Sequence, residues 1–324
     1  MWYNITQSWC GKNKNYIWKG AFLMDTNIFN NSNVISWLQY FSDNTDVDLE
    51  HVKILDITKK NKNLIPAVEA HRSVLVFTEA GHDDIFYRMF DAGLGECIVV
   101  YNEGSEPSGD IKRDKVANMI DRGINASAGM LILNDHARTT LKYGIDNSEL
   151  AYGSVKYVAS EIRTVLLSKM HLTEGKNVCV ISGESIAVEA AHCDGEGSII
   201  AVEYDSRDRS TMEDNVSRFG LDNITIVDHV GEDTMKDLPV PDVTMLVASA
   251  SMEKEMEYLL SVNPNMEFVV YTLDFTVAAS MENICKRFGI RDPEVIQMTV
   301  SKLTSKHTFQ TQPSPWIISF KAGE

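Results

Sequence analysis

The strongest constraint in this chain is the regular alternation of helical and strand patterns between Glu161 and Ser249. Short apolar runs, typical of buried strands, are separated by amphipathic stretches that are long enough for helices. Such alternation is typical of a doubly wound sheet of parallel strands with helices on both faces. The expected order is helix Glu161–Met170, strand Asn177–Ser182, helix Ser185–His192, strand Gly197–Asp205, helix Ser210–Phe219, strand Ile224–His229 and strand Asp242–Ser249.

The alternation of helices and strands continues beyond Ser249 and stops at the last two expected strands. The last two expected strands follow each other without a helix between them, so they should pair as an antiparallel hairpin. The sequence therefore predicts a parallel α/β sheet that is closed on one side by a hairpin. The further elements are helix Glu253–Ser261, strand Glu267–Leu273, helix Val277–Phe288, strand Glu294–Leu303 and strand Pro315–Phe320.

A second, smaller α/β domain is expected before this one. Asn134–Ser160 has few apolar runs and reads as a connector, so we place the boundary near Leu150, with domains at residues 1–150 and 151–324. The aromatic residues of the first fifty positions are expected to pack rather than to bind a ligand. The expected elements are helix Asn31–Tyr40, strand Lys53–Ile57, strand Ser73–Thr78, helix His82–Ala92, strand Cys97–Tyr101, helix Arg113–Arg122 and strand Gly129–Leu133.

Charge and composition exclude several classes of function. The net charge of −16 argues against binding to nucleic acid or to an anionic membrane surface. No apolar run approaches the roughly 18–20 residues that span a bilayer, and no leader segment is expected, so a cytoplasmic location is the default. The five cysteines show no metal-ligand spacing, so no metal site is predicted; Cys97, Cys179 and Cys285 fall in apolar patterns and should be core residues.

A nucleotide-like cofactor on such a sheet lies beyond the carboxyl ends of the strands. It needs an acid at the end of the second strand, roughly 20 residues after the first turn, to hold the ribose hydroxyl groups. Glu203 lies 21 positions after Ser182 and meets this requirement. The alternatives for Glu203 are an exposed strand-end acid or a cap for the following helix.

The turn after the first strand departs from the pattern that such a cofactor requires. Ser182-Gly183-Glu184 holds a single glycine, and Glu184 begins the next helix. A carboxylate suits the positive end of a helix dipole, but it repels an anionic group of a ligand. Asp228 and His229 end the third strand, where the base would lie, and His229 can equally be a polar strand-end residue. Glu189, on the helix after the turn, is expected to be solvated.

Several linked segments resemble one family in order and spacing. They are Glu161–Met170, Ser185–Ala191, Ala201–Asp205 and Asn215–Val227. They resemble the decarboxylating precorrin-6Y C5,15-methyltransferase family of cobalamin biosynthesis, whose C-terminal half has the class I methyltransferase fold. Asp83–Leu94 and Cys97–Pro107 are similar to part of that enzyme's partner half, which here lacks the lobe that completes its own cofactor site.

The resemblance implies S-adenosylmethionine (SAM) as cofactor, a tetrapyrrole as substrate and a homo-oligomeric assembly. Glu203 matches the family's ribose acid, and Gly183 alone carries over from the loop glycines. Arg163 matches an arginine of the helix before the first strand, so the resemblance implies that it faces substrate. The family's loop has the form Asp-x-Gly-x-Gly-x-Gly, and this chain departs from it at nearly every position. Three functions therefore stay open: methyl transfer to a tetrapyrrole ring carbon, a pseudoenzyme that lost SAM and serves as a binding or scaffold protein, and an enzyme that uses another ligand in the same crevice.

Overall fold

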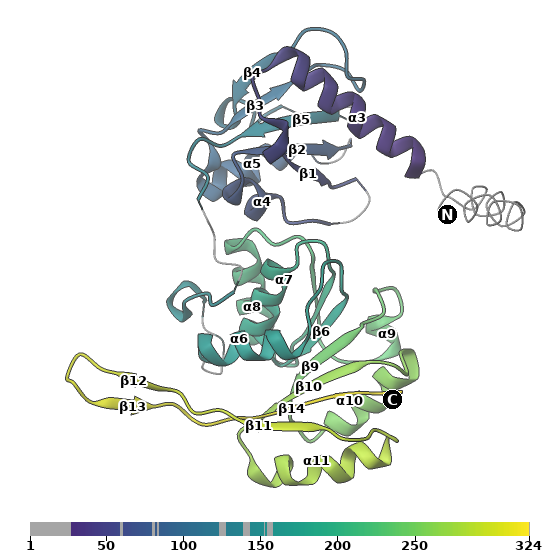
Figure 1. Ribbon diagram of the computed structural model, residues 1–324, viewed down its shortest axis with the longest axis vertical. Helices are drawn as coiled ribbons and strands as arrows, with labels where there is room; N and C mark the ends of the chain where they lie inside the picture. Colours follow the sequence, from purple (N-terminus) through teal and green to yellow (C-terminus); the bar gives the residue numbers. More distant parts are fainter. Residues whose placement is uncertain are drawn as a thin grey trace, which may run out of the picture.

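The chain folds into two α/β domains that are stacked along the long axis of the molecule (Figure 1). The computed structural model describes residues 27–58, 61–79, 82, 84–122, 128–138, 143–151, 153 and 158–323. The prediction that aromatic residues pack concerns Trp2, Tyr3, Trp9 and other positions before residue 27 as well, and these positions lie outside the described residues. Within the described part, no helix combines the length and the apolar character that crossing a bilayer demands.

The first domain is a five-stranded mixed sheet in the order β1-β2-β5-β3-β4. Strands β1 and β2 are parallel, and the other pairs are antiparallel. Its elements are α3 (Asn27–Asn44), β1 (Lys53–Asp56), α4 (Leu64–Ala70), β2 (Ser73–Thr78), α5 (Ile85–Met89), a π-helical turn (Phe90–Leu94), β3 (Ile98–Tyr101), β4 (Lys112–Lys115) and β5 (Ala128–Leu133).

Alternating side chains of β2 supply both cores of this domain. Val74 and Val76 pack with α4 and α5, whereas Leu75 and Phe77 pack under α3, as the two-residue period of a strand requires. Helix α3 covers its face with aromatic side chains, so the expectation that these aromatics pack is confirmed for the described ones. They are Trp37, Tyr40 and Phe41.

The helix expected over Arg113–Arg122 was wrong. Lys112–Lys115 forms β4, which pairs with β3 in antiparallel fashion, and a single 3-10 turn follows at Val116–Asn118. β4 is an edge strand with the sequence Lys-Arg-Asp-Lys. Charged side chains on an edge strand oppose pairing with another chain, and the same polar composition made this segment look helical in sequence.

The second domain is a seven-stranded sheet in the order β11-β14-β10-β9-β6-β7-β8. All strands run parallel except β14, which is antiparallel to both of its neighbours. Its elements are α6 (Ser160–Lys169), β6 (Val178–Ile181), α7 (Glu184–Cys193), β7 (Ile199–Val202), α8 (Ser206–Arg218), β8 (Ile224–Val227), α9 (Glu232–Met235), β9 (Val243–Val247), α10 (Met252–Val262), β10 (Glu267–Thr272), α11 (Phe275–Arg287), β11 (Glu294–Gln297) and β14 (Trp316–Lys321).

This sheet has a core on each face. Val178 and Val180 of β6 pack against α6, α7 and α8, and Cys179 and Ile181 pack on the side of α10 and α11. The doubly wound sheet with a closing hairpin, and its smaller preceding domain, are thus confirmed. Cys97, Cys179 and Cys285 are buried and free, as core residues should be, and burial raises the pKa of each thiol.

The long strand expected over Glu294–Leu303 is broken into two. After β11 the chain continues as β12 (Ser301–Leu303), which pairs only with β13 (Phe309–Thr311) and forms an arm that projects from the domain (Figure 1). Pro313 and Pro315 precede β14 on the opposite side of this hairpin. Since proline has no N–H to donate to a strand ladder, the two prolines account for the break.

Asn63 joins the two domains at the start of α4. Its side chain, 5% exposed, donates to the carbonyl of Ala191 at 2.9 Å and accepts from the Asp222 N–H at 2.8 Å. Arg88 of the first domain forms an ion pair with the Asp222 carboxylate. The first domain therefore docks against the ends of α7 and α8.

Candidate functional site

The carboxyl ends of β6, β7, β8 and β9 meet at one edge of the second sheet, because these strands are parallel neighbours. The residues predicted to bind a cofactor follow those strand ends directly. Ser182, Gly183 and Glu184 follow β6, Glu203 follows β7, and the pair Asp228 and His229 follows β8. Six of the seven predicted site residues therefore share one edge.

The turn after β6 is tight and partly strained. Ser182 is exposed and has a φ of 54°, a left-handed conformation that glycine adopts at lower cost. Gly183 is buried, and a Cβ there would lie 2.6 Å from Cγ1 of Val180. The backbone therefore passes too close to β6 for a side chain at position 183. Helix α7 begins at Glu184 without a side-chain cap.

Glu203 is neither an exposed strand-end acid nor a helix cap. It is only 5% exposed. Asp205 caps α8 instead, by accepting from the Arg207 N–H at 2.8 Å. The Glu203 Oε1 atom is buried without a hydrogen-bond partner. A buried acceptor without a donor is unfavourable, so this oxygen is suited to receive a hydrogen bond from a ligand.

The acids at this edge repel one another. Burial, the nearby charge of Glu184 and that of Asp208 raise the pKa of Glu203 to about 8, although the backbone N–H groups of Glu184 and Gly183 act to lower it. Burial and the Asp208 charge raise the pKa of Glu184 to about 7. The Glu184 Oε1 atom is also buried without a partner. Above about pH 8 this edge therefore holds buried negative charge, with one oxygen of Glu184 and one of Glu203 accepting no hydrogen bond.

The connector between the domains passes over these acids. A Cβ on Gly153 would lie 2.6 Å from Oδ1 of Asp208 and 2.9 Å from Oε2 of Glu184. A side chain at position 153 would therefore push against the ends of these two carboxylates. Because Gly153 touches both, Glu184 of α7 and Asp208 of α8 lie on the same side of the strand ends.

Sequence reasoning missed a further acid of this edge, Glu255. It is 4% exposed and accepts from the Tyr204 hydroxyl at 2.5 Å and from the Ser251 hydroxyl at 2.7 Å, while its Oε2 is buried without a partner. Its place on the apolar face of α10, between Met252 and Met256, was a signal that helical periodicity could have revealed. Among the described residues, every buried carboxylate oxygen without a partner belongs to Glu184, Glu203 or Glu255.

His229 is held by two acids. Its Nδ1 lies 2.7 Å from Oδ1 of Asp228, and its Nε2 lies 3.1 Å from Oδ1 of Asp233. Hydrogen bonds to Asp228 and then to Asp233 raise the pKa of the imidazole. Both ring nitrogens are engaged, so this geometry favours a role in holding the turn after β8.

Arg163 lies apart from the edge, in the interior of the domain. It is fully buried and forms an ion pair with the equally buried Glu189 at 2.7 Å. Its guanidinium also donates to the carbonyls of Val158 and Ile145 and to the side chain of Asn147. This placement favours a structural role for Arg163 over contact with substrate, and the expectation that Glu189 is solvated was wrong.

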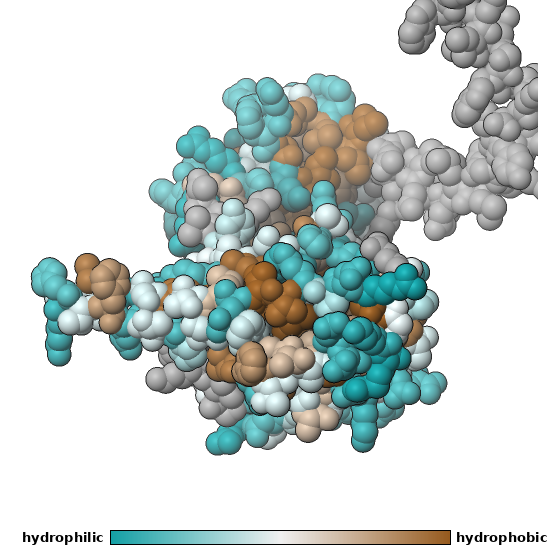
Figure 2. Space-filling view, turned by 60° about the horizontal axis from the view of Figure 1, so that its bottom comes forward, coloured by the Kyte–Doolittle hydropathy of each residue, from teal (hydrophilic) through white to brown (hydrophobic). Residues whose placement is uncertain are grey.

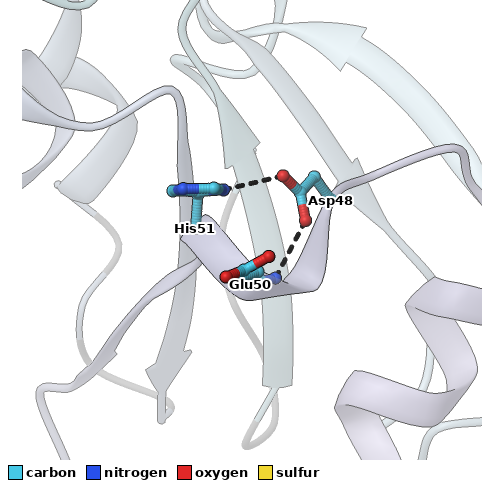
Figure 3. Close-up of side chains that lie close together, drawn as sticks. All are labelled: Asp48, Glu50 and His51. Carbon is cyan, nitrogen blue, oxygen red and sulfur yellow. Dashed lines mark hydrogen bonds and ion pairs between the residues drawn. The ribbon is translucent and has the colours of Figure 1, made fainter.

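Two other features lie away from the strand ends. Asp48, Glu50 and His51 are the one group in the described residues with the proximity of metal ligands (Figure 3), but all three are exposed and Asp48 caps the turn by accepting from the Glu50 N–H. A cavity of about 900 Å³ opens at the opposite, amino edge of the sheet, between the domains. Its lining includes Lys53, His71 and His171 and none of the predicted cofactor residues.

The order of the strands in the second domain and the position of the site residues at the carboxyl ends of these strands are those of the class I SAM-methyltransferase fold. Residues 155–314 match the model of a precorrin methyltransferase domain, which confirms the family resemblance found in the sequence. No curated protein matches the chain significantly.

A solved structure with a TM-score above 0.5 has the same fold. Precorrin-6Y C5,15-methyltransferase from Geobacter metallireducens aligns with a TM-score of 0.52 and 22% identity over 56% of this chain and 98% of its own. The C-terminal domain of the enzyme from Rhodobacter capsulatus aligns with a TM-score of 0.47 and 16% identity over 56% of this chain and 99% of its own. At these identities the likeness concerns the fold alone.

The residues present fit one end of SAM and not the other. The unpartnered Oε1 of Glu203 suits a ribose hydroxyl. At the other end, the N–H groups of Gly183 and Glu184 already act on the Glu203 carboxylate, and Glu184 adds a second carboxylate there. The site therefore matches the nucleoside and the positive charges of SAM but opposes its carboxylate.

Proposed function

We propose that the C-terminal domain binds an adenosyl nucleoside at the carboxyl edge of its sheet, with Glu203 accepting hydrogen bonds from the ribose hydroxyl groups. The observation that carries the proposal is the Glu203 carboxylate itself, which is buried at the end of β7 with one oxygen lacking a donor. Above about pH 8, where this carboxylate is ionised, hydrogen bonds to it contribute about 1.5–3 kcal/mol each, enough to govern affinity.

Isothermal titration calorimetry tests this proposal with a panel of SAM, S-adenosylhomocysteine and 5′-methylthioadenosine. We expect micromolar binding of at least one nucleoside, and at least a tenfold loss of that affinity in Glu203→Ala. Glu174→Gln is the matched control, because Glu174 is an exposed acid at the opposite edge of the sheet. Heat from none of the panel at millimolar concentration would rule the proposal out.

Methyl transfer to a tetrapyrrole ring carbon is the second candidate, and the family match over residues 155–314 favours it. In that case SAM supplies the methyl group and the leaving group, and the protein's own part is to hold the acceptor carbon in line with the methyl group. Transfer of a labelled methyl group from SAM to a tetrapyrrole tests it. The unfavourable charge of Glu184 toward the SAM carboxylate leads us to place nucleoside binding first.

We also propose a homo-oligomer, as the family resemblance implies. The arm formed by β12 and β13 stands clear of the rest of the surface (Figure 2) and exposes Leu303 and Phe309, which are 59% and 73% accessible. Light scattering after gel filtration should give a mass above the 36.3 kDa of one chain. Phe309→Ser should lower that mass, and a monomer in the unmodified protein would refute the assembly.

A further inference from the structure

The turn after β6 differs from a SAM site in charge as well as in shape. An incoming carboxylate at a helix N-terminus is normally received by free backbone N–H groups and by the positive end of the helix dipole. Here the first residue of α7 is itself an acid, and the N–H groups of Gly183 and Glu184 already act on the Glu203 carboxylate. The positive, N-terminal end of α7 therefore already interacts with the protein's own carboxylates, those of Glu184 and Glu203.

The same acids have the opposite effect on a cation. Glu184 and Glu203 each keep a buried oxygen without a partner, and Asp208 lies beside Glu184 under Gly153. Burial, and after it the charge of Asp208, raises the pKa of Glu184 to about 7, and burial followed by the charges of Glu184 and Asp208 raises the pKa of Glu203 to about 8. A positive charge placed between them removes the repulsion and gives the orphaned oxygens a donor.

A metal ion is a poor candidate for that charge. In the part of the chain that the structure describes, the grouping of close metal-type ligands falls at Asp48, Glu50 and His51 and not at this edge. The carboxylate oxygens of Glu184, Glu203 and Asp208 do not all lie within 4.8 Å of one another. An extended organic cation, whose charges are spread over several atoms, suits the spacing better.

We propose that the carboxyl edge of this sheet selects a cationic adenosyl nucleoside that lacks a carboxylate, with Glu184 pairing with the ligand's ammonium group in the place where a SAM carboxylate would otherwise lie. The inference rests on the proposed nucleoside site and names the class of ligand that this site prefers. Glu203 binds the ribose hydroxyl groups, and Glu184 forms an ion pair with the ammonium group at the other end of the ligand.

Three ligands that share the nucleoside separate the two claims. Decarboxylated SAM keeps the sulfonium and the ammonium and has no carboxylate, SAM adds the carboxylate, and 5′-methylthioadenosine carries neither charge nor carboxylate. By calorimetry at pH 8.5, where Glu184 is largely ionised, we expect decarboxylated SAM to bind at least tenfold tighter than SAM and at least threefold tighter than 5′-methylthioadenosine.

Glu184→Gln should collapse the preference for decarboxylated SAM over SAM to threefold or less, by weakening the first and strengthening the second. Glu174→Gln removes one negative charge at the opposite edge and should leave the preference unchanged. Thermal unfolding of each variant confirms that the protein is folded before titration. Glu203→Ala should weaken all three ligands together.

The outcomes that overturn the inference differ from those that overturn the nucleoside site. If SAM binds as tightly as decarboxylated SAM, or if 5′-methylthioadenosine does so, the ligand class is wrong while the nucleoside site stands. If Glu184→Gln leaves the preference unchanged, Glu184 is not the residue that reads the charge. If none of the three binds at millimolar concentration, the nucleoside site itself is lost and the inference falls with it.

Discussion

Helix α7 carries two buried acids that the protein treats in opposite ways. Glu189, in the middle of the helix, is fully buried, but Arg163 neutralises it at 2.7 Å and the Gly144 N–H donates to it. Glu184, at the start of the same helix, is half-buried, has an unpartnered oxygen and faces further acids. Removing one partner of a buried ion pair leaves a costly unpaired charge, whereas a buried acid that has no such partner either takes up a proton or gains a partner.

The paired site also fixes the connector. Arg163 and Glu189 bind the backbone at Gly144, Ile145 and Val158, so they fasten the segment between the domains to α6 and α7. Glu184 and Glu203 at the strand ends instead each keep one buried oxygen without a partner. The contrast separates structural charge from charge that serves a ligand.

The largest expected effect comes from breaking the paired site. Arg163→Ala leaves Glu189 buried without its cation, and removing one partner of a buried pair costs roughly 3–5 kcal/mol. Urea unfolding at pH 7.5 measures this loss. The double variant Arg163→Met with Glu189→Leu removes both charges and should recover most of it; no recovery would show that the carbonyl contacts of Arg163 dominate.

The unpaired site should respond in the opposite direction. A carboxyl whose pKa is raised from about 4.3 in the unfolded chain to about 8 in the folded protein binds its proton more tightly when folded. Its contribution to stability is therefore fully present below the unfolded pKa and is lost as the pH rises toward 8. Glu203→Gln should be more stable than the unmodified protein by roughly 2–4 kcal/mol at pH 8.5.

Urea unfolding at pH 5 and at pH 8.5 checks that prediction, because most of the advantage of Glu203→Gln should disappear at pH 5. The same variant should lose nucleoside affinity, since an amide oxygen is a weaker acceptor than a carboxylate. A variant that is less stable than the unmodified protein at both pH values would contradict the account of an unsatisfied acid.

Glu184→Gln should show the same trend with a smaller size. Glu184 is less buried than Glu203 and its pKa is raised less, to about 7, so its stability gain at pH 8.5 should be less than half that of Glu203→Gln. The same unfolding series measures it. An equal or larger gain would make Glu184 the main source of the repulsion.

The smallest effect concerns the strained turn. Ser182 has a φ of 54°, and Ser182→Gly relieves a left-handed backbone at a cost in unfolded-chain entropy, so we expect a gain of about 0.5–1 kcal/mol. Gly183→Ala, one residue on, should destabilise the protein because its Cβ would meet Val180. Thermal unfolding of the two variants gives the sign of each change.

The sequence predicted the helices and strands of this fold well where one hydrophobic pattern determines the secondary structure. The apolar runs around Val180 and Leu246 are buried on both faces and could only be central strands. It failed at β4, where a charged edge strand is stabilised by backbone pairing with β3 and not by its side chains. It failed again at Pro313 and Pro315, whose effect on the ladder depends on which strand lies opposite.

The position of the candidate site could be predicted from the sequence, but the burial and the pairing of its side chains could not. The spacing from Ser182 to Glu203 located the acid, yet only the structure shows that Asp205 takes over the capping role and leaves Glu203 buried. Arg163 was placed near substrate by resemblance, whereas its partner Glu189 lies 26 positions away in the sequence and reaches it only through the packing of α6 on α7. Pairing of this kind depends on tertiary packing and leaves no local signal.

The most direct test of the central claim is a carbon-13 NMR titration of the glutamate side-chain carboxyls in the protein without ligand. Two glutamates should titrate near pH 7 and pH 8; Glu184→Gln should remove the first resonance and lower the pKa of Glu203, and Glu203→Gln should remove the second. If every glutamate carboxyl instead completes its titration below about pH 5.5, close to the ordinary range, the strand ends carry no unneutralised buried charge and the proposed selection of a cationic ligand has no physical basis.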